Sequence, residues 1–144
     1  MVDKQNQILF QIDSIIRKSF YQKPIKGLEV GKPANITLEL KFGINKDKSI
    51  ISTFLKVDFS QKRKKFMGIE IVHNFKVKEK SVFDDCTPDK LKLPQEFLLT
   101  LASISISGSR GVLAANNTTA PYNKYYLPLI DPKSLIAMDL EKEK

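Results

Sequence analysis

The sequence contains one cysteine, Cys86, and one histidine, His73. A single cysteine excludes an internal disulfide and is typical of a reducing compartment. The same scarcity argues against zinc, because a standard zinc site needs several His or Cys ligands. No apolar run approaches the ~20 residues of a membrane-spanning helix, and the polar first seven residues predict no secretion signal. We therefore expect a cytoplasmic protein that holds no metal and no other cofactor.

Catalytic motifs are equally scarce. His73 falls on an inward position of a predicted strand, where a structural histidine is far commoner than a catalyst. The glycine-rich residues 107–111 follow a predicted helix instead of opening one, and they lack the lysine of a phosphate-binding loop. We interpret them as a helix end with Gly111 in a left-handed cap. Without the groups that an active site requires, the chain is not expected to be an enzyme.

Charge is distributed unevenly along the chain. The net charge is +8, and residues 1–80 carry 17 Lys/Arg against 8 Asp/Glu, whereas residues 81–144 carry 7 against 8. A basic surface attracts nucleic acid, anionic membrane or acidic protein, or it only keeps the protein soluble. Four consecutive cations at 62–65 suit nucleic acid, but they are also typical of a solvated hairpin tip. The aromatic spacing matches no RNA-recognition signature, so nucleic acid is the less favoured partner.

Alternation of apolar and polar residues predicts four strands within residues 8–78. Near Ser14 the alternation breaks, which indicates a bulge in the first strand. Polar turns at 45–49 and 61–65 join neighbouring strands antiparallel. The third and fourth strands should each place an aromatic side chain, Phe54 and Phe66, on the face that does not carry the core.

The second part of the chain predicts a helix-loop-helix over residues 93–140, after a crossover at 79–92. Pro94 suits a first helical turn. A stripe at helical spacing follows, which consists of Phe97, Leu101, Ile104 and Gly108. Arg110-Gly111 and the polar residues 116–119 then break the helix into a loop. A second helix should begin at Pro132 with Asp131 as its cap. The order predicts one α+β domain over 1–144, a four-stranded antiparallel sheet followed by two helices packed on one face.

Aromatic side chains exceed what one small core needs. Phe54 and Phe66 on the outward face, with loop tyrosines Tyr122, Tyr125 and Tyr126, would suit a groove for an extended peptide or another subunit. Alternatively, each tyrosine pins the loop to its own sheet. Both interpretations fit the sequence.

Several strings of the sequence, taken in order, resemble the SecB family of export chaperones. LFQIDSIIRK at 9–18, followed by Phe20 and Pro24, is similar to the family's first strand. The run from 93 to 111 and the string LPLIDPKSL at 127–135 are similar to its helix, Arg-Gly and closing motif. The resemblance covers nearly the whole chain and depends on the order and spacing of these strings.

The resemblance implies a dimer of dimers and an ATP-independent holdase that keeps non-native chains unfolded for delivery. It implies client grooves lined partly by the loop 114–126, which contains the three tyrosines. Together with the outward aromatic residues this gives Phe54, Phe66, Tyr122, Tyr125 and Tyr126 as the expected client-binding residues. The export chaperone docks its translocation motor through acidic residues, and the basic sheet half of this chain argues against such docking. One alternative is a SecB-like chaperone dedicated to a single client such as an antitoxin. Another is a basic nucleic-acid-binding module.

Overall fold

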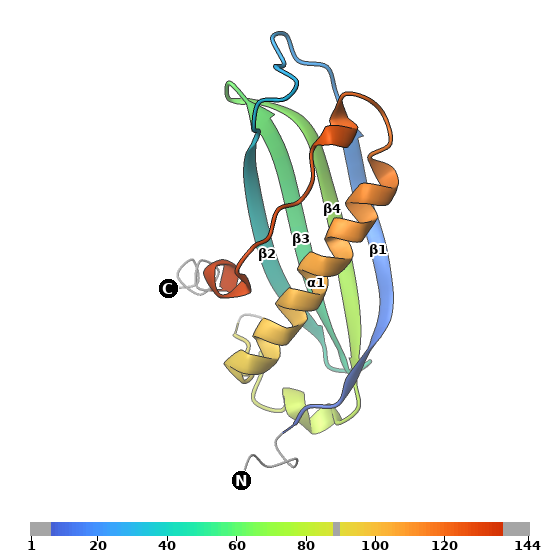
Figure 1. Cartoon of the computed structure of the whole chain (residues 1–144). Helices are drawn as coiled ribbons and strands as arrows, with labels where there is room; N and C mark the ends of the chain where they lie inside the picture. Colours follow the sequence, from blue (N-terminus) through green and yellow to red (C-terminus); the bar gives the residue numbers. More distant parts are fainter. Residues whose placement is uncertain (1–6, 88–89, 137–144) are drawn as a thin grey trace.

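The structure, a computed structural model, describes residues 7–87 and 90–136. A four-stranded antiparallel sheet is followed by a long helix that lies across one face of it (Figure 1). The strands are β1 (Phe10–Gln22), β2 (Asn35–Asn45), β3 (Ile50–Gln61) and β4 (Lys64–Val77), and the helix is α1 (Gln95–Asn116). Two short 3-10 helices, η2 (Lys80–Phe83) and η3 (Tyr122–Lys124), precede and follow α1. The predicted α+β class and antiparallel sheet are confirmed.

The first strand does not pair with the second. The order across the sheet is β1-β4-β3-β2, so that β1 and β2 are the two edges. The β1 strand shifts register against β4 between Ile12 and Ser14, which confirms the predicted irregularity, and again between Arg17 and Ser19. Each bulge bends the strand and interrupts its ladder. The chain's first strand is therefore an edge with two bulges.

The core lies between α1 and the inner face of the sheet. Alternate residues of the two central strands are buried there, and they include Leu55, Val57, Phe59, Ile69, Ile71 and Phe75. The helix approaches closely because small side chains occupy much of its buried face. One of them, Ser105, has its hydroxyl 2.5 Å from that of Thr53 on β3 and donates to the Leu101 carbonyl at 2.7 Å. These contacts hold the helix against the middle of the sheet.

The helix does not end at Gly111. It continues to Asn116, and Gly111 has no left-handed backbone, unlike Gly27 and Gly31. The predicted cap is wrong because Leu113 extends the buried face by another turn. Arg110 also secures this turn, since its guanidinium donates to the carbonyls of Leu127 and Pro128 at 2.9 and 2.8 Å.

The buried line of α1 also differs from the predicted stripe. It passes through Leu98, Leu101, Ser105, Ser109 and Leu113, while Ile104 and Gly108 lie at its margin. Residues 132–136 are helical, and the predicted continuation of that helix to Leu140 lies outside the described residues.

By length and composition alone, α1 could span a membrane. The mean hydropathy of its best 18-residue window is 1.4, and 44% of that window is buried inside the domain. Its uncharged stretch, from Phe97 to Ser109, is shorter than the ~20 residues of an apolar membrane span.

Candidate functional site

The tyrosine loop turns most of its aromatic surface inward. Tyr125 is only 8% exposed, and its ring lies edge-on to Phe66 at 5.0 Å between centroids. Its hydroxyl accepts from the Gln61 side-chain amide at 3.2 Å and lies 3.4 Å from the Glu29 carbonyl. Both the ring and the polar end of Tyr125 are satisfied within its own subunit.

Phe66 is a second residue that the structure places differently from the prediction. It is completely buried, and half-buried Tyr122 stacks on it at 6.2 Å. A register shift between Phe59 and Ser60 explains the error, because Phe59 pairs with Met67 and Ser60 with Lys65. Phe66 sits in the resulting bulge, so strict alternation fails there.

Asn117 organises the loop at the end of α1. Its side-chain N–H groups donate to the carbonyls of Tyr122 at 2.6 Å and Tyr125 at 3.0 Å, and its Oδ1 accepts from Gln22 of β1 at 2.7 Å. Tyr126, by contrast, is 65% exposed. The three tyrosines therefore do not form one surface, and only Tyr126 presents most of its ring to solvent.

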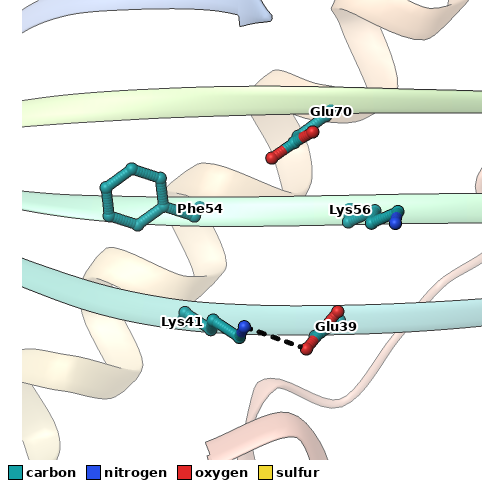
Figure 2. A pocket seen from close by; sticks show the side chains of 5 residues that line it. All are labelled: Glu39, Lys41, Phe54, Lys56 and Glu70. Carbon is teal, nitrogen blue, oxygen red and sulfur yellow. Dashed lines mark ion pairs between the residues drawn. The ribbon is translucent and has the colours of Figure 1, made fainter. Parts of the chain in front are cut away.

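Phe54 lies on the outer face of the sheet, as predicted, but among charges (Figure 2). The side chains around it alternate in sign, and Lys41 pairs with Glu39 at 3.3 Å. A cross-strand row of Glu39, Lys56 and Glu70 borders the ring. The sheet separates Phe54 from Phe66 and the tyrosines, so the five predicted client-binding residues do not meet at one site.

A hydrogen bond on the outer face fastens β1 to the sheet. The Tyr21 hydroxyl reaches over β4 and donates to Asp58 of β3 at 2.7 Å. Gly68 lies beneath the tyrosine ring, and a Cβ at that position would overlap the ring. Burial, together with the hydrogen bond to Asp58 and its charge, raises the pKa of Tyr21, which therefore stays protonated as a donor.

An apolar, uncharged surface lies between β1 and α1. We name it the β1–α1 groove; its lining residues are Ile12, Ile15, His73, Ser103, Ile104, Ser107 and Gly108. Ile12 and Ile15 are 47% and 46% exposed. Among the described residues, no charged side chain lines the groove. Because a surface helix normally turns charged residues to solvent, this uncharged margin of α1 is unusual.

His73 forms the floor of the groove. It is fully buried, and neither ring nitrogen has a hydrogen-bond partner within the part of the chain that the structure describes. The ring stacks on Phe75 at 6.1 Å, and the backbone of α1 passes so closely that a Cβ on Gly108 would overlap it. Burial lowers the pKa of His73 below its ordinary value, which favours the neutral imidazole.

The outer edge of β1 carries backbone groups without a strand partner among the described residues. The two bulges leave a regular segment of four residues between them, from Ser14 to Arg17, which pairs with β4 on its other side. Arg17 also donates to Asn116 at the end of α1, which ties the segment to the helix. An unpaired edge beside an apolar groove is a template for a further extended strand.

Sequence reasoning did not identify the β1–α1 groove. Two signals could have found it: the adjacent Ile15 and Ile16 in a bulged strand, and the charge-free stretch of helix from Phe97 to Ser109. Among the described residues, no group of three or more His, Cys, Asp or Glu side chains could hold a metal ion. What the arrangement offers chemically is recognition of apolar side chains and of an extended backbone.

No protein-family model matches the chain, and no curated protein matches it either.

Proposed function

We propose that the protein is an ATP-independent chaperone that holds extended apolar segments of non-native polypeptides. The observation that carries the proposal is the β1–α1 groove, an uncharged surface with half-exposed isoleucines beside an unpaired strand edge. A monomeric domain seldom leaves such a combination open without a use for it.

The mode of binding follows from the geometry of the edge. A client strand pairs its backbone with residues 14–17 of β1, and its alternate side chains enter the groove over Ile15 and Ile104. Backbone pairing is independent of sequence, and the small side chains Ser103 and Ser107 leave room for clients of different shape. Each isoleucine still has about half of its surface to bury, which stabilises the complex by about 1 kcal/mol. Such binding is weak and reversible, as a holding chaperone requires.

Membership of the SecB-like family is part of the proposal. It is supported by the order of strands and helix, by the strings at 9–18, 93–111 and 127–135, and by a strand edge that could pair with a client. A general role in export and a role for one dedicated client, such as an antitoxin, are both compatible with a groove that recognises apolar segments. The groove involves the exposed edge of β1 more than the tyrosine loop, so we place the client there and keep Tyr126 as an additional contact.

Self-association would use the same edge. An antiparallel pairing of two β1 strands centred on Ile15 sets Ile15 of one copy against Ile15 of the other, which is an apolar cross-strand pair within the regular segment. Because this pairing occupies the client's position, we propose that a second copy and a client compete for it. Light scattering should then show the dimer fraction falling as an apolar client peptide is added.

A matched pair of variants tests the chaperone proposal. Ile15 faces the groove and Ile16 faces the outer side, yet the two are adjacent and 46% and 48% exposed. Without nucleotide, the unaltered protein should suppress aggregation of a chemically denatured model protein. Ile15→Lys should lose most of this suppression because a charge enters the groove, whereas Ile16→Lys should retain it. Equal suppression by the two variants, or none by the unaltered protein, would reject the proposal.

A further inference from the structure

One end of the molecule gathers an excess of positive charge. This basic end comprises residues 23–34, 58–65 and 117–126, where the β1–β2 connection, the β3–β4 turn and the loop after α1 come together (Figure 1). It has eight exposed cations and two acids, Glu29 and Asp58, which gives a net charge of +6 from 8 − 2. The cations are Lys23, Lys26, Lys32, Lys62, Arg63, Lys64, Lys65 and Lys124. The described residues of the opposite end, within 45–50 and 76–96, hold seven cations and five acids.

The two acids of the basic end are already paired. Glu29 lies 3.7 Å from Lys32 and 3.3 Å from Lys62, and Asp58 lies 3.5 Å from Lys65. Among the described residues, no acid lies within ion-pair distance of the other five cations, which are Lys23, Lys26, Arg63, Lys64 and Lys124. The basic end therefore retains positive charge that no acid among the described residues neutralises.

The β3–β4 turn has a backbone that its side chains do not favour. Gln61 pairs with Lys64, and the two residues between them, Lys62 and Arg63, have φ values of 51° and 65°. A two-residue hairpin with both φ values positive is strongly preferred by Asn-Gly and is strained with longer side chains. Lys-Arg is a poor choice for closing the hairpin, but it places two cations at the tip. Strain of this kind points to a function.

We propose that the basic end binds the phosphate backbone of double-stranded nucleic acid without reading its sequence. Seven of the eight cations are lysines, which act as point charges toward phosphate oxygens and do not require the fixed geometry of a forked guanidinium. A hairpin tip is convex and fits against a duplex groove more readily than around a flexible peptide. Base stacking on a single strand needs several exposed rings, and Tyr126 is the one largely exposed aromatic among the described residues of this end.

Binding of this kind gains free energy from release of the counterions that surround the duplex. About five phosphate contacts would give a slope of about −4.5 for the logarithm of the binding constant against the logarithm of salt concentration. No base contact is involved, so affinity should be equal for duplexes of different sequence. Duplex binding is separate from the chaperone proposal, and Ile15→Lys should bind duplex as tightly as the unaltered protein.

The test compares two variants of equal net charge, +6 from 8 − 2. One carries Lys62→Asn and Arg63→Gly at the tip, and the other carries Lys46→Gln and Lys78→Gln at the opposite end. Fluorescence anisotropy with the full chain and a labelled duplex of arbitrary sequence measures affinity between about 50 and 200 mM salt. We expect the tip variant to bind about tenfold more weakly, with a slope shallower by about 1 because Arg63 is one of the five cations without an acid partner, and the control variant to change little.

Folding is monitored in the same samples. Because Asn-Gly relieves the strained turn, the tip variant should melt about 3 °C higher while it binds more weakly. A lower melting temperature would overturn the strain interpretation and with it the proposal. The proposal also fails if the unaltered protein does not bind duplex, or if the two variants weaken equally, which would indicate net charge without a site. Displacement of the duplex by polyglutamate at equal charge concentration would assign the surface to an acidic polypeptide instead.

Discussion

The two margins of α1 differ in how they meet the sheet. On the side of the tyrosine loop, Phe66 and Tyr125 are buried, and the end of the loop is fixed through Asn117. On the side of β1, isoleucines stay half-exposed above a buried histidine. The aromatic residues that suggested a binding surface, Phe66 and Tyr125, belong to the core. The exposed apolar surface is formed by β1, whose sequence predicted only a strand with a bulge.

The difference has a physical basis. A tyrosine has an apolar ring and a polar end, so it suits a position at the border of a core where its hydroxyl finds a partner. Tyr125 has such a position between Phe66 and Gln61. Ile15 has no polar group to satisfy and half of its surface exposed, so another apolar surface is its favourable neighbour. Exposed aliphatic residues on a strand edge are the more informative signal here.

The buried side of α1, next to the tyrosine loop, is tested most strongly by truncating Phe66. Phe66→Ala should lower the free energy of unfolding by about 3–5 kcal/mol, because it opens a cavity among Phe59, Tyr122 and Tyr125. Phe54→Ala removes the same side chain from a half-buried place on the outer face and should cost about 1 kcal/mol. Urea denaturation measures both. Similar losses for the two variants would contradict the assignment of Phe66 to the core.

The close contact between α1 and His73 beneath the β1–α1 groove is tested with two glycines of α1 that lie three residues apart. A Cβ on Gly108 would overlap the His73 ring, whereas a Cβ on Gly111 would meet no atom within 4 Å. Gly108→Ala should therefore destabilise the fold by about 2 kcal/mol. Gly111→Ala should stabilise it by about 0.5–1 kcal/mol, because alanine is the better helix former. A loss of stability in Gly111→Ala would indicate that the helix ends at that residue.

The buried histidine predicts a dependence of stability on pH. The pKa of His73 is lowered in the fold, so below about pH 6.5 the unfolded chain takes up a proton that the folded chain does not. The free energy of unfolding should be highest above that pH and fall by up to about 1.4 kcal/mol per pH unit until the folded-state pKa is reached. His73→Gln should flatten this part of the profile in denaturation experiments. Profiles of equal slope would contradict a buried, neutral imidazole.

Local patterns predicted much of the fold. Alternation located all four strands and the bulge near Ser14, because side-chain parity is a local property of the chain. The position of β1 beside β4 could not be predicted, since it depends on a pairing between distant segments. The same limitation explains Phe66, whose burial follows from a register shift against β3. Gly111 suggested a helix end locally, but packing of Leu113 extended the helix.

The candidate site was predicted less well than the fold. Phe54 was placed on the correct face, and Tyr126 is exposed, but neither lines the β1–α1 groove. The sequence showed that the excess positive charge belongs to residues 1–80, but it did not show where on the folded surface that charge lies. The three segments of the basic end are distant in the sequence and meet only in the folded chain.

The most direct measurement of the central claim is backbone hydrogen exchange with and without an excess of an extended apolar client peptide. If the client adds a strand at the open edge, the amides of residues 14–17 that point away from β4 should exchange more slowly when it is bound. Amides of the β2 edge, within Asn35–Asn45, serve as the internal control and should not change. Protection at the tyrosine loop with none on β1 would contradict the account.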